Sequence, residues 1–459
     1  MSSIKRKKKL SIAQKIALSF LSVIFVGSLL LSLPISQSAN SQAQYLDHLF
    51  ISVSMVCVTG LFTQPVVSSY SSFGQIVNIL LMQIGGLGLM TIMAVFLYSI
   101  GKRVSYNDKM AISEAINKDG LGDLKSYLKR LFKTTFIIEG LGALLLSIRF
   151  IPQFGIGKGI FNSIFMAVSG FCNAGFVNFS TYSLLDYVHD PLVNIVVSSL
   201  LIFGGLGFAV WFDLFDQIRK YVTHQKGLKG MFKSFRLHTK VVLKMTLLLL
   251  FWGTVIPLII EYNNPQTLGS FSFLEKVLAS YFQSATMRTA GFATMDYTLY
   301  KSSSILVFVI LMFVGGSPGG TAGGVKTTSI RLVTLFIKGE VMGSDHVNLG
   351  HYSVSNNLLR KAVTVFIIYS LVLLGGAFLL CVIHPEHSML LLLFEAISAL
   401  ATVGVSANLT PILSRTAHII LMILMIAGRI GPLTLYLSFS KPNQKKTQPQ
   451  YAHADILVG

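Results

Sequence analysis

Four glycines recur along the chain at nearly equal intervals, and their neighbours could supply a ring of oxygen ligands. Gly60, Gly175, Gly291 and Gly404 lie 115, 116 and 113 residues apart, and four intervals of that size account for nearly all of the 459 residues. Each glycine closes a short segment; the segments are Val58-Thr59-Gly60, Asn173-Ala174-Gly175, Thr289-Ala290-Gly291 and Thr402-Val403-Gly404. Equivalent strands around one axis would present backbone carbonyls to a dehydrated alkali cation. The spacing therefore predicts an ion-binding ring.

The elements that must position these segments are membrane helices. Hydrophobic residues make up 53% of the chain, charged residues 12%, and the mean hydropathy is +0.67. A bilayer core needs about 20 apolar residues per helix. Eight segments are long enough, and the first is expected to be a span rather than a cleaved signal peptide. They are residues 12–33, 76–100, 132–152, 192–212, 241–261, 304–336 with a break after 316, 362–384 and 416–439.

Between the two spans of each quarter lies an apolar segment that is too short to cross. These segments, at 45–57, 160–172, 273–287 and 389–401, each end beside one of the four glycines. Extended backbone at membrane depth is stable only inside protein or along a water-filled cavity. The sequence thus predicts an all-α membrane protein of four pseudo-fourfold-related repeats, each helix–pore loop–helix, around a central ion pore. The expected repeats are 1–105, 106–220, 221–338 and 339–440, followed by a cytoplasmic tail at 441–459.

The net charge of +19 comes from basic residues that gather between the repeats and near both ends of the chain. They lie mainly at 5–9, 102–130, 219–240, 338–361 and 441–446. Because loops rich in Lys and Arg stay in the cytoplasm, both termini and the inter-repeat loops are predicted to be cytoplasmic, and the glycine loops open outward. The same residues suit contact with anionic membrane lipid, and we expect no nucleic-acid partner.

A second group of glycines follows each ring glycine by 24 to 30 residues. In repeats one and two these clusters, Gly85-Gly86-Leu87-Gly88 and Gly204-Gly205-Leu206-Gly207, are interpreted as close packing within membrane helices. In repeat three the cluster extends over 315–328, where six glycines and a proline exclude a continuous helix. The segment must lie in or against the pore. It is predicted to be a gate formed by Gly315, Gly316, Ser317, Gly319, Gly320, Thr321, Gly323, Gly324 and Lys326. A phosphate-binding loop is the competing interpretation, but the motif spacing does not match and no strand precedes it.

Two arginines accompany these features. Arg429 lies among apolar residues at the depth of the gate. It is expected either to face the pore, where it would repel the cation or hold the gate by hydrogen bonds to its carbonyls, or to pair with Glu139 or Asp213. Arg288 precedes Gly291 by three residues and is expected to point away from the axis. A pairing with a carboxylate of a short helix is predicted for it, with Asp47, Glu275 or Glu395 as candidates.

These features together resemble the Trk/Ktr/HKT superfamily of K⁺ transporters, and specifically the KtrB-type membrane subunit of bacterial Ktr systems. The resemblance covers the whole chain and implies K⁺ uptake across the plasma membrane, with K⁺ bound at the ring carbonyls and Na⁺ as a candidate stimulating ion. It implies that a glycine at position 60 is associated with a preference for K⁺ over Na⁺. It further implies a homodimer with a cytoplasmic ring of KtrA-like subunits that bind nucleotide. The chain has no ATP-binding motif, so we expect no organic cofactor in it; the segments 338–361 and 441–459 are candidate docking surfaces.

Two other classes remain as alternatives. A Na⁺-coupled secondary symporter of a small solute also uses broken helices, although these usually come in two inverted halves. A membrane enzyme would need clustered reactive side chains, whereas the histidines, including His48, His189, His384 and His387, are interpreted as scattered over loops. The three cysteines have no metal-ligand spacing. We therefore expect no enzymatic activity.

Overall fold

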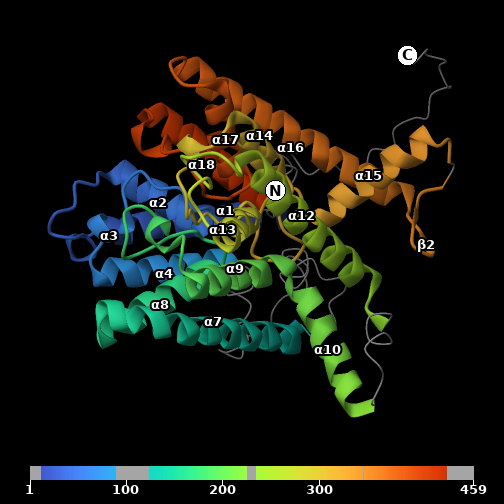
Figure 1. Ribbon diagram of the computed structural model, residues 1–459, viewed down its shortest axis with the longest axis horizontal. Helices are drawn as coiled ribbons and strands as arrows, with labels where there is room; N and C mark the ends of the chain where they lie inside the picture. Colours follow the sequence, from blue (N-terminus) through green and yellow to red (C-terminus); the bar gives the residue numbers. More distant parts are fainter. Residues whose placement is uncertain (1–11, 89–123, 225–233, 345, 432–459) are drawn as a thin grey trace, which may run out of the picture.

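Helices dominate the computed structural model, which describes residues 12–88, 124–224, 234–344 and 346–431 (Figure 1). In chain order they are α1 Ile12–Ser32, α2 Tyr45–Cys57, α3 Val66–Ser69, α4 Ser72–Leu87, α7 Leu124–Phe154, α8 Ile156–Phe171, α9 Pro191–Leu206, α10 Phe208–His224, α12 Leu237–Glu261, α13 Phe273–Thr286, α14 Ser302–Phe313, α15 Thr327–Val341, α16 Asn356–Ile383, α17 Met389–Leu400 and α18 Arg415–Ile430. The 3-10 turns within these ranges are η1 Pro34–Ser36, η2 Leu185–Tyr187, η3 Tyr297–Leu299 and η4 Thr410–Ile412. The short strands β1 Asn348–Leu349 and β2 Tyr352–Ser353 form an antiparallel hairpin that the sequence did not predict.

The helices pack as four units, each with a long helix, a short helix and a second helix after an extended return segment. The units are α1–α2–α4, α7–α8–α9, α12–α13–α14 and α16–α17–α18. Within each unit the long helix contacts the short one. Between units, the second helix contacts the short helix of the next unit: α4 with α8, α9 with α13, α14 with α17, and α18 with α2. Since the last contact returns to unit one, the packing order is closed.

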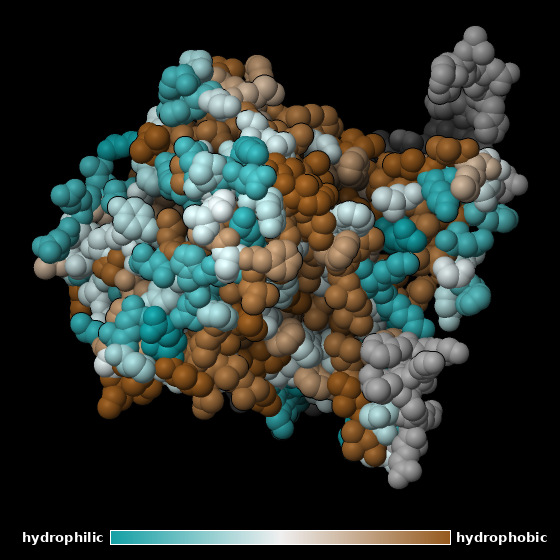
Figure 2. Space-filling model, viewed as in Figure 1, coloured by the Kyte–Doolittle hydropathy of each residue, from teal (hydrophilic) through white to brown (hydrophobic). Residues whose placement is uncertain are grey.

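The composition and exposure of the long helices identify a membrane protein. Among the described residues, α1, α7, α12 and α16 are long and apolar enough to cross a bilayer, and α9 with α10 forms a further pair bent by 100°. Large apolar side chains such as Leu247, Phe251 and Leu374 are exposed on these helices. Figure 2 shows hydrophobic side chains over a broad part of one face. Such a surface suits lipid rather than water.

The prediction of continuous helices over 76–100, 192–212 and 416–439 was wrong, because each of these helices ends at a glycine. α4, α9 and α18 end before Gly88, Gly207 and Gly431, whose φ angles are 82°, 89° and 91°. Positive φ is incompatible with a right-handed helix and is open mainly to glycine. The predicted spans 76–100 and 416–439 continue into residues outside the described ranges. Close packing is also present, because a methyl group on Gly85 or Gly204 would collide with a backbone carbonyl of a short helix.

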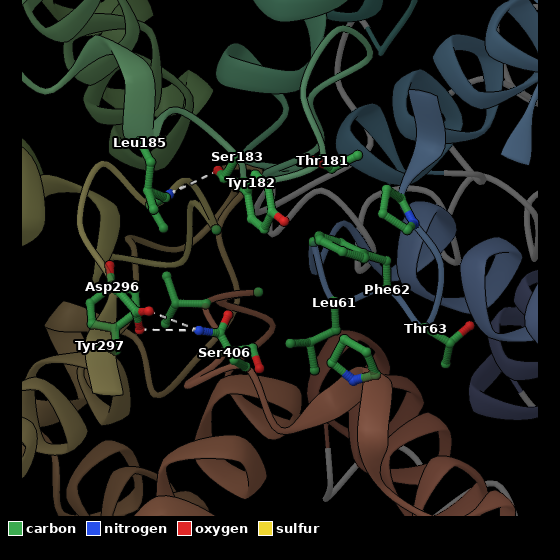
Figure 3. A pocket seen from close by; sticks show the side chains of 18 of the residues that line it. Leu61, Phe62, Thr63, Thr181, Tyr182, Ser183, Leu185, Asp296, Tyr297 and Ser406 are labelled. Carbon is green, nitrogen blue, oxygen red and sulfur yellow. Dashed lines mark hydrogen bonds between the residues drawn. The ribbon is translucent and has the colours of Figure 1, made fainter. Parts of the chain in front are cut away.

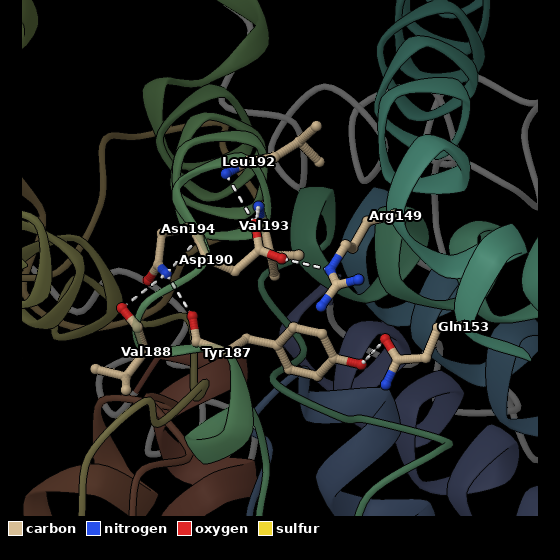
Figure 4. A network of polar contacts seen from close by, with 8 residues as sticks. All are labelled: Arg149, Gln153, Tyr187, Val188, Asp190, Leu192, Val193 and Asn194. Atoms are coloured by element: carbon tan, nitrogen blue, oxygen red, sulfur yellow. Dashed lines mark hydrogen bonds and ion pairs between the residues drawn. The ribbon is translucent and has the colours of Figure 1, made fainter.

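The return segment of unit two is fixed by a polar network at its entry into α9 (Figure 4). Asp190 caps α9 by accepting hydrogen bonds from Leu192 N and Val193 N at 3.0 and 3.1 Å. Its other carboxylate oxygen pairs with Arg149 Nε of α7 at 2.7 Å. Asn194 donates to the Tyr187 carbonyl at 2.7 Å. Arg149, one of the few basic residues near the predicted outer side, therefore has a structural partner.

Candidate functional site

The four glycine segments meet in a closed order. A methyl group built on Gly60, Gly175 or Gly291 would lie 2.8 Å from a carbonyl oxygen of the following unit, and one on Gly404 would collide with a carbonyl of unit one. The glycine and carbonyl pairs are Gly60 with Ala174, Gly175 with Ala290, Gly291 with Val403 and Gly404 with Thr59. Only glycine allows so close an approach of backbones. We call residues 58–60, 173–175, 289–291 and 402–404 the glycine ring.

All four segments of the ring share one unusual backbone conformation. The first and third residues of each have positive φ, and the first residues are Val58 (56°), Asn173 (61°), Thr289 (66°) and Thr402 (50°). Three of these four are β-branched, and a left-handed conformation is strained for such residues. Strain of this kind costs about 1–3 kcal/mol per residue and tends to occur at functional sites. The repetition in all four units marks these segments as the candidate functional site.

A hydroxyl group of each short helix fixes the segment that follows it. Ser54 accepts from Gly60 N at 3.1 Å, and Ser398 accepts from Gly404 N at 3.0 Å. Ser169 and Thr286 donate to the carbonyls of Phe176 and Phe292 at 2.8 and 2.7 Å. Sequence reasoning missed these four residues. The available signal was a Ser or Thr five or six residues before every ring glycine.

A second polar contact in each unit holds the residue two or three positions after the glycine. The pairs are Thr63 donating to Asp47 (2.6 Å), Asn178 to Asn162 (2.9 Å), Gln283 to Thr294 (3.0 Å) and Ser406 to Glu395 (2.7 Å). In each pair one partner belongs to a short helix. Because buried polar groups left without partners are costly, these pairs fix each return segment in one position.

The predicted ion pair of Arg288 is not formed. Arg288 is buried, and its Nε has no hydrogen-bond partner among the described residues. The three candidate carboxylates are engaged elsewhere: Asp47 with Thr63, Glu275 with Ser272 and Glu395 with Ser406. The prediction was wrong because Glu275 caps its own helix, and Asp47 and Glu395 bind the return segments.

Residues 314–326, which we call the bridging loop, connect α14 to α15 and contact the glycine ring directly. The single hydroxyl hydrogen of Thr321 is shared between the Phe171 carbonyl at 3.1 Å and Asn173 Oδ1 at 3.0 Å. Gly323 N donates to Thr289 Oγ1 at 3.2 Å. The loop also pairs with the broken end of α9, since Ser317 N and Thr321 N donate to the carbonyls of Gly205 and Gly204. The gate residues predicted from sequence thus lie against the ring-forming segments.

Internal contacts close the bridging loop on itself. Gly315 N donates to the Val325 carbonyl at 3.1 Å, and Gly316 N to the Gly323 carbonyl at 3.2 Å. Ser317 and Thr327 share a hydrogen bond of 3.0 Å between their hydroxyls. Lys326 Nζ donates to the Ala322 carbonyl at 2.6 Å. These bonds satisfy loop backbone that lipid could not satisfy.

Arg429, in the last turn of α18, joins the bridging loop to unit one. Its guanidinium donates to the carbonyls of Thr321 and Gly85. The alternative pairing with a carboxylate was wrong, because Glu139 instead contacts Gln83 and Asp213 accepts from Arg236 N. The Arg429 guanidinium therefore binds two carbonyl oxygens, one in the bridging loop and one in α4.

A cavity of about 500 Å³ lies beside the glycine ring and is lined by none of the residues of the bridging loop (Figure 3). Gly60, Gly291 and Gly404 form part of its wall. Among the described residues that line it, Asp296 is the one carboxylate and none is lysine or arginine. Asn408 Nδ2 of unit four holds both oxygens of Asp296 at 3.1 Å. The cavity therefore has a fixed negative group and suits a cation.

Four short helices end at the glycine ring, beside an open cavity and among helices long enough to cross a membrane. Residues 7–449 match the family model described as "TrkH: Cation transport protein", so the chain belongs to this family of cation transporters. This confirms the resemblance found in the sequence.

Similar proteins match over nearly their full length. "Ktr system potassium uptake protein B" of Bacillus subtilis (strain 168) is 36% identical over 97% of this chain and 96% of its own. The protein of the same name from Vibrio alginolyticus is 35% identical, with 97% and 94% covered. "Potassium/sodium uptake protein NtpJ" of Enterococcus hirae is 34% identical, with 99% and 98% covered. The crystal structure of the potassium transporter TrkH from Vibrio parahaemolyticus shares the fold, with a TM-score of 0.73, 17% identity, and 96% of this chain and 87% of that one covered.

Proposed function

We propose that this protein takes up K⁺ across the bacterial plasma membrane through the glycine ring, driven by the membrane potential. The observation that carries the proposal is the closed order in which each ring glycine approaches a carbonyl of the next unit. Similar proteins named as potassium uptake proteins support K⁺ as the transported ion. The name of a third includes sodium, and this supports Na⁺ as a second ion that stimulates or accompanies uptake.

In this mechanism K⁺ loses its water and is coordinated by the ring carbonyls. The short helices end at the ring, so the negative ends of their dipoles favour a cation there. A potential of 100 mV contributes about 2.3 kcal/mol per charge, equivalent to about 50-fold accumulation. Uptake therefore needs no nucleotide hydrolysis in this chain.

The proposed pore is pseudo-fourfold, with repeats 1–105, 106–220, 221–338 and 339–440. The closed packing order of the units supports this division. The proposed orientation places both termini and the basic inter-repeat loops in the cytoplasm and opens the cavity outward. Of the two candidate docking segments, 338–361 includes the β1–β2 hairpin, and the tail 441–459 lies outside the described residues.

The bridging loop is the proposed gate, with Arg429 holding it closed. Its contacts with Asn173 and Thr289 support this role, because a loop in that position obstructs the exit from the ring. We further propose a homodimer that binds a cytoplasmic ring of KtrA-like, nucleotide-binding subunits. The word "system" in the names of two similar proteins supports a partner of some kind.

Rb⁺ uptake by a bacterial strain that lacks its own K⁺ uptake tests the function. Expression with a regulatory subunit should restore growth at low K⁺ and give Rb⁺ uptake that excess K⁺ abolishes. Deletion of 317–324 should raise that uptake, with membrane insertion checked by surface labelling. Na⁺-dependent accumulation of an organic solute without Rb⁺ uptake would favour the symporter and contradict the proposal.

A further inference from the structure

Two histidines and a glutamate form a compact cluster between α16 and α17, away from the glycine ring. His384 Nδ1 lies 2.7 Å from Glu386 Oε1, and His387 Nε2 lies 3.8 Å from the same oxygen. One ligand atom from each of the three residues lies within 4.8 Å of the other two. The interpretation of the histidines as scattered was therefore wrong for this pair, because the turn after α16 brings both rings to one carboxylate.

We propose that His384, Glu386 and His387 bind a divalent transition-metal ion, with Zn²⁺ as the best match. Zn²⁺ binds imidazole nitrogen and carboxylate oxygen at about 2.0–2.2 Å, so ligand atoms of a tetrahedral site lie about 3.4 Å apart. The observed separations of 2.7 and 3.8 Å lie on either side of this value. Three protein ligands leave a fourth position for water. Ca²⁺ and Mg²⁺ prefer sites built of oxygen ligands, so two imidazoles select against them.

The cluster is both accessible and held in place. The side chains of His384, His387 and Glu386 are 11%, 26% and 58% exposed, so an ion can enter from solution. His384 Nε2 is fixed by Ser414, whose N and Oγ both lie 3.0 Å away.

Ser414 positions His384 and makes a further test possible. In the metal-free protein Nε2 accepts from Ser414 N–H, so Nδ1 carries the proton and donates it to Glu386. When a metal ion binds Nδ1, that proton moves to Nε2, which then donates to Ser414 Oγ in place of the hydrogen bond that it accepted from Ser414 N–H. Groups that orient a metal-binding histidine in this way typically contribute about 10–100-fold to affinity.

Zn²⁺ titration of the purified full-length protein, with any histidine tag removed, tests the site. We expect one Zn²⁺ per chain, and Co²⁺ as a substitute should give tetrahedral absorption bands. Glu386→Gln and His387→Ala should each weaken binding at least about tenfold, and Ser414→Ala about tenfold. His346→Ala and His351→Ala change exposed histidines near the β1–β2 hairpin and should leave affinity unchanged.

The proposal is wrong if saturable binding is absent, or if Glu386→Gln and His387→Ala bind Zn²⁺ as tightly as the unmodified chain. His384→Ala also removes the contact to Ser414 at the start of α18, so its loss of binding could come from a folding defect. His387→Ala leaves that contact intact and therefore tests metal binding alone. The readout is metal binding and not transport. A positive result therefore stands whether or not the chain moves K⁺.

Discussion

Replacing Gly60 by alanine tests whether the close approach of backbones in the glycine ring sets ion preference. The new methyl group would lie 2.8 Å from the Ala174 carbonyl oxygen and 3.2 Å from the Cα of Gly404. Relief of these contacts requires movement of several tenths of an ångström, and such overpacking costs about 1–3 kcal/mol. The φ of +107° adds about 1–2 kcal/mol for any residue with a side chain. The total cost is about 2–5 kcal/mol, and relieving it displaces the Ala174 carbonyl, which is proposed to coordinate the ion.

Functional sites require their groups within about 0.5 Å of the productive position. We therefore expect Gly60→Ala, like Gly60→Ser, to lower the preference for K⁺ over Na⁺ about tenfold or more, equivalent to 1.4 kcal/mol. The assay is Rb⁺ uptake into proteoliposomes with Na⁺ as competitor, normalised to folded protein. Thermal unfolding measured in the same detergent reports stability.

Two other glycines serve as controls that separate the effect of backbone strain from that of steric collision. Gly155 has a φ of +82° with open space around its Cα, so Gly155→Ala introduces backbone strain without collision. Gly140 lies within α7, also with open space, so Gly140→Ala introduces neither. Gly155→Ala should lose stability and keep ion preference, while Gly140→Ala should keep both. If folded Gly60→Ala protein has unchanged flux and selectivity, the ring is not the ion site.

The remaining predictions concern the loop, the cavity and one buried carboxylate. Arg429→Ala should raise basal Rb⁺ uptake severalfold, because the bridging loop loses a charge-assisted hydrogen bond; unchanged or lower uptake by folded protein contradicts gating. Thr321→Val removes the hydroxyl that contacts Phe171 and Asn173 and should raise uptake, whereas Thr321→Ser keeps it and should not. Asp296→Asn should raise the apparent Km for Rb⁺ severalfold at low ionic strength, and an effect that persists at 1 M salt argues against electrostatic attraction. Glu261→Gln should lower the unfolding temperature by several degrees, since both Glu261 oxygens accept hydrogen bonds and an amide nitrogen cannot; an unchanged temperature contradicts this.

The short helices could be predicted from sequence because their limits are local properties. The predicted segments 45–57, 273–287 and 389–401 agree within one residue with α2, α13 and α17. Apolar length and the following glycine define each one. The segment predicted at 160–172 begins four residues earlier, at Ile156, because the positive φ of Gly155 ends α7 and allows α8 to start at once.

The side-chain contacts of the site could not be predicted because they depend on how distant segments align. Asp47 and Glu395 were recognised as carboxylates near the ring, but their partners Thr63 and Ser406 are set by the path of each return strand. For Arg429, sequence left a carbonyl contact and an ion pair open. Gly85 is 344 residues away, and only the packing of unit four against unit one brings it within reach.

The bridging loop breaks the near-symmetry of the four units, and as the proposed gate it would act on all of them through a few contacts. Thr321 and Gly323 bond to the ring residues Asn173 and Thr289 of units two and three. Arg429 of unit four holds the Thr321 carbonyl and simultaneously a carbonyl of unit one. Hydrogen bonds to charged groups contribute about 1.5–3 kcal/mol each. Because α15 begins directly after the loop, the proposed partner would have to supply energy of that order to open the proposed gate by displacing α15, and one displacement would break the contacts to all four units together.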